Sequence, residues 1–239
     1  MGTEKEIQII KIPAGISNAY IIKKGENSLM IDTGDKGLGK IESIFHSNNI
    51  NYRDIFMIVI THTHKDHVNL LYDLNKKLYA EIVVHKDGEE FLKFGQSPDP
   101  KNGSLPGKLI YFFSKLFGNN KFKPVVPDTT ITGDYFFDKL GFDIRIIYTP
   151  GHTKDSLSVI IDKKYAFVGD TLFTIFPRTI TPMLIDNKDD LISSWEKLLD
   201  LKCDYYFPGH GRKISYEKFL AYYKKFSTAT EQLFEVKYN

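Results

Sequence analysis

The stretch that decides the fold is Ile58-Val59-Ile60-Thr61-His62-Thr63-His64-Lys65-Asp66-His67, in which an apolar β-branched run ends in three histidines and an aspartate. The run is typical of a buried strand, and the polar residues are typical of the loop that follows it. Zinc takes imidazole nitrogens and carboxylate oxygens as ligands, so the loop carries suitable donors. In a nearly extended loop, His62 and His64 point the same way. Asp66 and His67 then turn away, which suits them to a second metal ion.

Three further potential ligands follow apolar runs later in the chain. His152 follows Thr149-Pro150-Gly151, and His210 follows Pro208-Gly209, so each stands beside a Pro-Gly pair that marks a turn. Asp170 also ends an apolar run. A single histidine in such a place is more often an ordinary hydrogen-bonded residue than a ligand. Five histidines and two aspartates at strand ends favour a metal site.

This pattern resembles the metallo-β-lactamase superfamily, whose signature is His-x-His-x-Asp-His followed by a His, an Asp and a final His. In this chain the matching residues are His62, His64, Asp66, His67, His152, Asp170 and His210. The resemblance extends from Asn18-Ala19-Tyr20 and Ile31-Asp32-Thr33-Gly34 to Gly209-His210-Gly211. It implies an α/β fold, a four-layer αββα sandwich with the metal ions at one edge.

The resemblance also implies how the ligands divide between two zinc ions per chain, with iron or manganese as the other candidates. Site one would take His62, His64 and His152. Site two would take Asp66, His67 and His210, with Asp170 bridging both ions. Asp66 would also act in catalysis as a proton shuttle. Asp32 would support the histidine loop, although an ordinary turn aspartate is an equal reading. His85 follows a strand as well, but it matches no ligand of the family.

The ligand types predict hydrolytic chemistry. Three imidazoles leave a zinc ion one open position, which is the mark of a catalytic site. Two ions about 3.5–4 Å apart share a hydroxide, and the pKa of the bound water falls to about 7. The chain has no Gly-x-Ser-x-Gly nucleophile elbow. We therefore expect a metal-bound hydroxide to attack the substrate without a covalent enzyme intermediate.

Composition is ordinary for a soluble globular protein, with 239 residues, 42% hydrophobic and 26% charged. A single domain, 1–239, is expected. With 32 basic and 30 acidic residues, the net charge of +2 gives no indication of nucleic acid as a partner. The single cysteine, Cys203, excludes an internal disulfide. No signal peptide is visible in 1–12, so a cytoplasmic location is expected. The longest aromatic-apolar run, 109–113, is too short to span a membrane.

Periodicity and turn residues predict alternating strands and helices. Strands are expected over 7–12, 18–32 (with a hairpin turn at 24–27), 80–84, 129–132, 142–148, 157–161, 165–168 and 204–207. Helices are expected over 37–48, 68–78, 187–201 and 215–234. Residues 86–128, with recurring Gly and Pro, are predicted to be an irregular insertion that includes a short aromatic helix, about 108–117. We interpret the insertion as a lid or pocket wall over the metals; a contact in a homodimer is the alternative.

Candidate substrate contacts lie in two places. Phe173, Phe176 and Arg178 follow the bridging aspartate, and Phe112 and Phe113 belong to the insertion. Phe173 and Phe176 are equally well explained as core residues.

The favoured function is a metal-dependent hydrolase that cleaves an ester, thioester or lactone of a small, partly apolar substrate. Alternatives are a binuclear redox enzyme, a mononuclear iron enzyme similar to persulfide dioxygenases, and a non-catalytic metal-binding module. Diiron flavoproteins usually carry glutamate at the position of His64, and lactonases often carry tyrosine near Phe173. Only 28 residues follow Gly211, which leaves little room for the glutathione-binding segment of glyoxalase II relatives. Family members often have glycine at the position of Asp155, a departure that leaves the ligands untouched.

Overall fold

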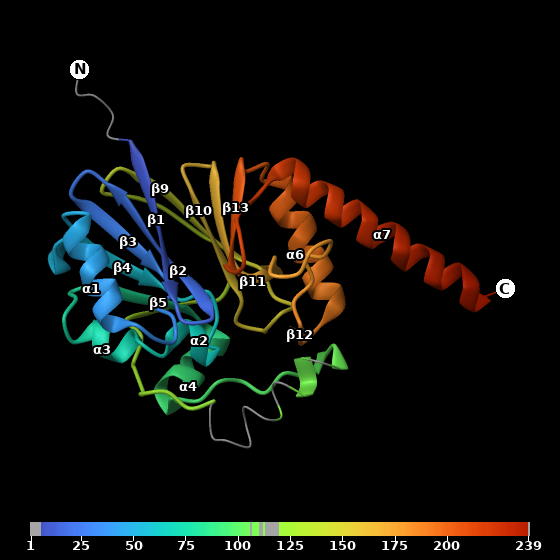
Figure 1. Ribbon diagram of the computed structural model, residues 1–239, viewed down its shortest axis with the longest axis horizontal. Helices are drawn as coiled ribbons and strands as arrows, with labels where there is room; N and C mark the ends of the chain where they lie inside the picture. The colour runs from blue at the N-terminus through green and yellow to red at the C-terminus, as the bar shows by residue number, and fades with distance from the viewer. Residues whose placement is uncertain (1–5, 106, 110–111, 113–119, 239) are drawn as a thin grey trace.

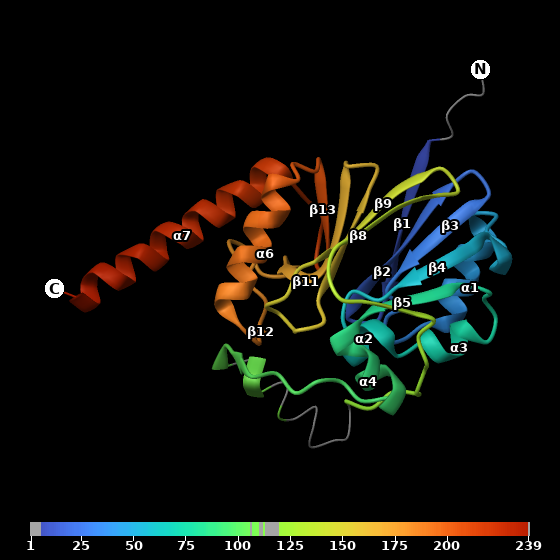
Figure 2. The same ribbon diagram turned by 180° about the vertical axis from the view of Figure 1, so that it is seen from behind.

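The computed structural model describes residues 6–105, 107–109, 112 and 120–238, with the backbone alone for 228–238. Two six-stranded sheets face each other, and helices cover both outer faces, as Figures 1 and 2 show. This arrangement is the αββα sandwich predicted from the sequence.

The first sheet has the strand order β1-β2-β3-β4-β5-β7 and the second β14-β13-β11-β10-β9-β8. The strands of the first sheet are β1 (Ile7–Ala14), β2 (Ser17–Lys24), β3 (Asn27–Ile31), β4 (Ile55–Val59), β5 (Glu81–His85) and β7 (Thr129–Ile131). Those of the second are β8 (Tyr135–Lys139), β9 (Phe142–Tyr148), β10 (Leu157–Ile161), β11 (Tyr165–Phe173), β13 (Tyr205–His210) and β14 (Ile214–Ser215). A separate short pair joins β6 (Asn102–Gly103) to β12 (Leu184–Ile185).

The helices divide between the two outer faces (Figure 1). On the first sheet lie α1 (Leu38–Ser47), the 3₁₀ turn η1 (Tyr52–Asp54), α2 (Lys65–Val68), α3 (Leu71–Asn75) and α4 (Lys86–Phe94). On the second lie α6 (Lys188–Asp200) and α7 (Tyr216–Tyr238), which projects beyond the sandwich. No helix in the part of the chain that the structure describes is long and apolar enough to cross a membrane.

Three hydrophobic clusters hold the four layers together. Along β3, Leu29 and Ile31 pack between the sheets, whereas Met30 packs beneath the helices of the first sheet. Along β10, Val159 belongs to the cluster between the sheets and Ile160 to the cluster beneath α6. Successive side chains of a strand point to opposite faces, so strands buried on both sides are apolar at nearly every position. This explains why these runs show little polar alternation.

Strand direction brings the ends of several strands to one edge. Strands β3, β4, β5 and β7 run parallel, and so do β11 and β13. The carboxyl ends of parallel strands meet at the same side of a sheet. The loop after β4, the later part of β11, the end of β13 and the β9–β10 loop therefore lie together.

The structure differs from the predicted elements in several places. The helix expected over 68–78 is confined to α3 and is separated from α2 at Asn69 and Leu70, because the Asn69 side chain donates to Asp35 O and the Leu70 N–H donates to Gly34 O. Residues 86–94, expected to be irregular, form α4, which ends at Gly95 in a left-handed conformation. Strand β8 was not predicted, because its sequence Tyr-Phe-Phe-Asp-Lys shows no alternation of apolar and polar residues. Strand β11 continues past the predicted residue 168 to Phe173.

The insertion 86–128 contacts the sandwich at several described places, and two of them bear on the candidate site. Ser97 Oγ accepts a hydrogen bond from the Lys65 N–H in the histidine loop, at 2.7 Å. Strand β6 pairs with β12, Gly103 opposite Leu184. Most of the aromatic segment 108–117, including Phe113, lies outside the described residues.

We expect Gly34→Ala to destabilise the protein by about 3 kcal/mol, measured by urea unfolding, because two penalties combine. Gly34 has φ +81°, and an added Cβ would lie 2.1 Å from the Ala14 Cβ. Gly39→Ala is the matched control, since nothing lies within 4 Å of its Cβ position in α1. That change should stabilise by up to about 1 kcal/mol. Equal effects of the two substitutions would contradict this account.

Candidate metal centre

The structure brings all seven sequence-predicted ligands to the shared edge of the sheets. They form overlapping groups whose potential ligand atoms lie within 4.8 Å of one another: His62, His64 and His152; His62, His67 and Asp170; Asp66, His67 and His210. His64 and Asp66 are half-buried, and the other five are buried. Because His62 and His67 each belong to two groups, the geometry shows one continuous cluster.

The first group has the spacing of a shared ion. His64 Nδ1 lies 3.1 Å from His62 Nε2 and 3.0 Å from His152 Nε2. Two nitrogens on one tetrahedral zinc ion, each about 2.0–2.1 Å from it, would stand about 3.3 Å apart. The three rings therefore converge at a distance close to that of a coordination sphere.

The second group mixes a carboxylate with imidazoles. His210 Nε2 lies 3.0 Å from Asp66 Oδ2 and 3.4 Å from His67 Nε2. Asp170 stands between the groups: its Oδ1 is 3.4 Å from His67 Nε2, and its Oδ2 is 3.7 Å from His152 Nε2. This central position lets one carboxylate face both groups.

Two features near Asp170 fit a cation. Asp170 Oδ1 is buried and has no hydrogen-bond partner among the described residues. A buried polar atom without a partner is costly, and a bound cation would satisfy it. Gly209 leaves the needed space, since a Cβ there would lie 2.3 Å from Asp170 Oδ1 and 2.5 Å from His67 Cε1.

Asp32 holds both ends of the histidine loop. Its carboxylate accepts hydrogen bonds from the Thr61 N–H at 2.8 Å, the Thr61 hydroxyl at 2.7 Å and His67 Nδ1 at 2.7 Å. His62 Nδ1 in turn lies 3.1 Å from the Thr61 hydroxyl. These bonds leave Nε2 of both histidines facing the cluster, which is how outer carboxylates orient ligands. The contacts place Asp32 in the supporting role.

Asp155 holds the middle of the same loop, and the sequence did not reveal it. Its Oδ2 accepts from the Thr63 N–H at 2.8 Å and from the Thr63 hydroxyl at 2.7 Å. Thr63 lies between His62 and His64, so this contact fixes the backbone that carries both. The available signal was the acidic residue at a position where glycine is common. Burial raises the pKa of Asp155.

His152 is oriented from the other side of the site. Its Nδ1 donates to the Leu184 carbonyl at 2.8 Å, which leaves Nε2 facing His64. Leu184 belongs to β12, which pairs with β6 of the insertion. The insertion therefore helps to orient His152, because it pairs with the strand that carries the Leu184 carbonyl.

The pKa values separate two kinds of histidine. Burial, and then the neighbouring histidines, lower the pKa of His62 well below its usual value. Burial and His152 lower that of His64 to about 3. Burial also opposes charge on His67, but Asp32, Asp66 and Asp170 together raise its pKa well above the usual value. His210 behaves in the same way, with Asp170 and Asp66 as its partners.

The two carboxylates of the cluster stay ionised. Burial would raise their pKa values, but the histidines outweigh it: His67 and His210 lower the pKa of Asp66, and His210 and His67 lower that of Asp170 to about 2. Neutral imidazoles and ionised carboxylates are the forms that bind metals.

Of the candidate substrate residues, Phe173 contacts the cluster directly. Phe173 is 7% exposed, and its ring centroid is 4.8 Å from that of His210. Phe176 is 47% exposed, and its ring centroid lies 6.2 Å from that of Phe173. Arg178 is exposed on the same loop, and Phe112 is 59% exposed.

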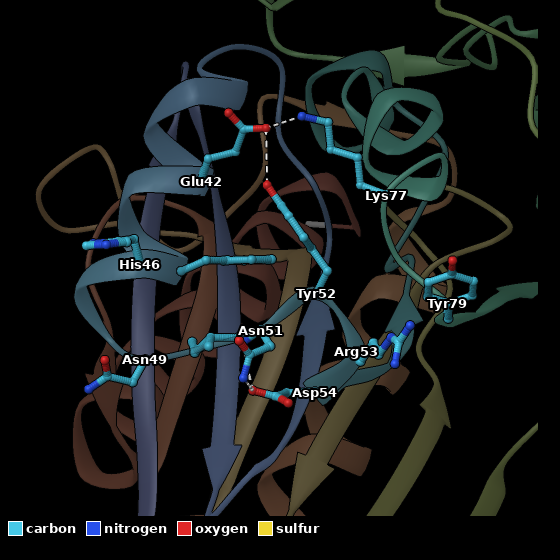
Figure 3. A pocket seen from close by; sticks show the side chains of 11 residues that line it. Glu42, His46, Asn49, Asn51, Tyr52, Arg53, Asp54, Lys77 and Tyr79 are labelled. Atoms are coloured by element: carbon cyan, nitrogen blue, oxygen red, sulfur yellow. Dashed lines mark hydrogen bonds and ion pairs between the residues drawn. The ribbon is translucent and has the colours of Figure 1, made fainter.

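A hollow of about 1000 Å³ lies elsewhere, beside η1 (Figure 3). Within it, Tyr52 and Lys77 point toward Glu42, and the Arg53 guanidinium lies 6.0 Å from the Tyr79 ring centre. Residues 52–54 precede β4, whereas the histidine loop follows it. This hollow therefore lies at the opposite end of the strand, and none of the seven clustered residues lines it.

Comparison with known proteins agrees with the fold. Residues 12–210 match the Metallo-beta-lactamase superfamily. The chain is 28% identical over 216 residues to the metallo-beta-lactamase fold-containing protein ST1585 of Sulfurisphaera tokodaii, covering 85% of this chain and 78% of that protein. The solved structure of ST1585 superposes with a TM-score of 0.67 at 25% identity, covering 91% of this chain and 85% of that one.

Two further relatives have hydrolase names. The hydroxyacylglutathione hydrolase GloC of Haemophilus influenzae is 31% identical over 216 residues, covering 86% of this chain and 90% of that protein. The atrochrysone carboxyl ACP thioesterase of Aspergillus fumigatus is 25% identical over 203 residues. That match covers 83% of this chain but 51% of the thioesterase.

The chain belongs to the metallo-beta-lactamase superfamily. Its relatives support metal-dependent hydrolysis in general. The fold and its clustered histidines and aspartates imply a divalent metal ion.

Asp155→Ala should weaken metal affinity about 10–100-fold, because the Thr63 donors that position the loop lose their acceptor. Competition with a chromogenic chelator measures this. Asp155→Asn keeps one acceptor oxygen and should lose less. Asp87→Ala, which removes a carboxylate that is 48% exposed, is the control and should bind metal normally. Unchanged affinity in folded Asp155→Ala would refute the positioning role.

Metal binding near neutral pH should release protons. The raised pKa values of His67 and His210 favour an extra proton on each imidazole without a cation, and a protonated imidazole must lose it to bind one. Release of up to about two protons is expected, and affinity should rise with pH. Calorimetry in buffers of different ionisation enthalpy measures the release.

Asp32→Asn removes the charge that most raises the pKa of His67, so it should reduce the release. His46→Ala, on the exposed face of α1, should not. No proton release in the parent protein would contradict the histidine assignment.

Proposed function

We propose that this chain is a two-metal hydrolase that cleaves the acyl bond of a thioester or ester with a small, partly apolar acyl group. The observation that carries the proposal is the convergence of five imidazoles and two carboxylates at one edge of the sandwich. The seven side chains include no serine or cysteine, so this cluster contains no side chain of the usual acyl-transfer nucleophiles.

His62, His64 and His152 would hold one ion, and Asp66, His67 and His210 the other, with Asp170 between them. Zinc is the first candidate, with iron or manganese as alternatives. When bound, divalent ions lower the pKa of water and polarise a carbonyl oxygen. The complete second group, with its three ligand atoms in reach of one another, favours two ions over the mononuclear iron alternative.

The remaining task for the protein is to move a proton to the departing thiol or alcohol. Asp66 fits this role because its side chain is 22% exposed, whereas those of His67 and Asp170 are 0% and 6% exposed. One of its oxygens, Oδ2, faces His210 at 3.0 Å. We assign Asp66 as both ligand and proton carrier, with His210 orienting it.

Several features favour a thioester or ester over a lactone. Two relatives are named for thioester cleavage, GloC and the acyl-carrier-protein thioesterase. Phe173 offers an apolar wall against His210 and has no hydroxyl to stabilise a lactone oxygen. Phe176 and Phe112 would extend that wall, with the insertion 86–128 as a lid that excludes water from the site.

The proposal predicts two metal equivalents per chain after gentle purification, measured by elemental analysis. Asp170→Ala should hold fewer, because the carboxylate between the two groups is gone. Asp138→Ala, an exposed aspartate of β8, is the control and should hold two. Normal two-metal content in Asp170→Ala would overturn the assignment of Asp170.

A panel of chromogenic esters, thioesters and lactones with defined metals tests the activity. Thioester or ester cleavage should stop with a strong chelator and return with added metal. In oxygen-18 water, a single turnover should place label in the acid product, with no acylated protein in rapid-quench mass spectra. A trapped acyl-enzyme would refute the mechanism.

A further inference from the structure

A basic hollow of about 650 Å³ lies next to the candidate metal centre. It lies between the loop 174–179, which follows Phe173, and residues 211–214, which follow His210, and the first turns of α7 complete it. Four basic side chains line it: Arg178, Arg212, Lys213 and Lys218. No aspartate or glutamate is among its described lining residues.

This charge is not balanced locally. The whole chain has 32 basic and 30 acidic residues, so four cations with no carboxylate depart from the average mixture. None of the four forms an ion pair within the described part of the chain. A concave surface of one sign focuses the field on an incoming ligand of opposite sign.

A fifth cation adds to the crowding. Lys11 Nζ donates to the Gly211 carbonyl at 2.9 Å. Burial, and then the like charge of Arg212, lower the pKa of Lys11. The positive charge of Arg212 thus repels Lys11, and a bound anion would relieve this repulsion.

Aromatic side chains share the hollow with the cations. Phe176 and Tyr222 both line it. Lys218 Nζ lies 6.0 Å from the Tyr222 ring centre, and Lys213 Nζ lies 4.2 Å from that of Tyr205. Basic groups beside exposed aromatic rings are the combination that receives phosphates together with a flat base.

The hollow is held in shape before any ligand arrives. The Phe173 N–H donates to the Ile180 carbonyl at 2.8 Å and closes the loop. Thr174 Oγ1 accepts from the Arg212 N–H at 2.8 Å and donates to its carbonyl at 2.7 Å. Arg178 has φ +72°, a left-handed conformation that costs about 1–3 kcal/mol in a residue with a side chain. Such ordering reduces the entropy lost on binding.

The far part of this hollow is separated from the candidate metal centre. Ile214 pairs with Tyr206, four residues before His210 along β13. At about 3.3 Å per residue, the far part of the hollow lies about 13 Å from His210. A ligand anchored in that far part reaches the metal centre only through an arm of about that length.

We propose that this basic hollow binds the nucleotide phosphates of a thiol carrier, so that the substrate is an acyl thioester whose leaving group is a nucleotide-bearing thiol. This inference rests on the proposed function. Hydrolysis would add water across the C–S bond, giving a carboxylic acid and a free thiol, with the phosphates unchanged. The cations anchor the phosphates, an aromatic ring faces the base, and the arm delivers the thioester to Asp66 and its neighbours.

Binding of 3′,5′-ADP to the metal-loaded full chain is the first test, by calorimetry. The Kd should rise at least tenfold in Arg212→Gln, and the parent Kd should rise with salt. Arg53→Gln, an arginine at the opposite end of the sandwich, is the matched control and should leave the Kd unchanged. An Arg212-independent Kd would overturn the proposal, because the phosphates would then bind elsewhere, for example at the metals.

Kinetics with one acyl group on two thiols is the second test. The ratio of kcat/KM for the coenzyme A thioester to that for the N-acetylcysteamine thioester should exceed ten. It should fall at least tenfold in Arg212→Gln, mainly through KM, and stay constant in Arg53→Gln. Equal kcat/KM values for the two thioesters would overturn the carrier assignment and leave the hydrolase standing.

Three other outcomes separate this inference from its rivals. If no thioester is cleaved while 3′,5′-ADP still binds through Arg212, the proposed function fails and the nucleotide hollow stands. If cleavage of a glutathione thioester depends more strongly on Arg212 than cleavage of the coenzyme A thioester does, the hollow binds carboxylates. The proposal of a nucleotide ligand would then be wrong. If an oligoribonucleotide binds through Arg212 more tightly than 3′,5′-ADP does, the proposal of a small nucleotide-bearing thiol would also be wrong.

Discussion

The carboxylate of Asp32 is the contact on which the metal centre depends most. It accepts three hydrogen bonds, two from Thr61 and one from His67, and so joins the first and last parts of the histidine loop. Asp32 itself has φ +56°, a strained conformation where β3 turns into the next loop. Such strain persists only where surrounding contacts determine it. Here the three hydrogen bonds to the buried Asp32 carboxylate hold the backbone in this conformation.

Asp155 repeats the arrangement from the second half of the chain. Each aspartate accepts from the N–H and the hydroxyl of one threonine, Asp32 from Thr61 and Asp155 from Thr63. The two threonines alternate with His62 and His64 in the loop. Alternate residues of an extended segment face opposite ways, so the threonines anchor the loop while the histidines face the cluster. Each half of the sandwich thus supplies one anchor.

The sequence alone revealed the clustered histidines and aspartates better than the residues that support them. Histidines at strand ends are chemically distinctive, and parallel strands bring their carboxyl ends together, so the cluster could be predicted. Asp155 could not be, because its role depends on a partner 92 residues away and it binds no metal in the predicted scheme. The helix break at Asn69 was missed for the same reason, since it follows from a side-chain bond to Asp35. Local periodicity carries no information about such tertiary bonds.

The hollows of this protein also show why volume is a poor guide to function. The hollow in Figure 3 is larger than the basic one, yet its charges neutralise one another, as Lys77 does with Glu42. The basic hollow has no such internal partners and lies beside His210. Cations left without partners destabilise a folded surface slightly, through mutual repulsion. A surface that keeps them gains only when an anion binds. Binding energy obtained about 13 Å from the reacting bond can then position the substrate for the step at the metals.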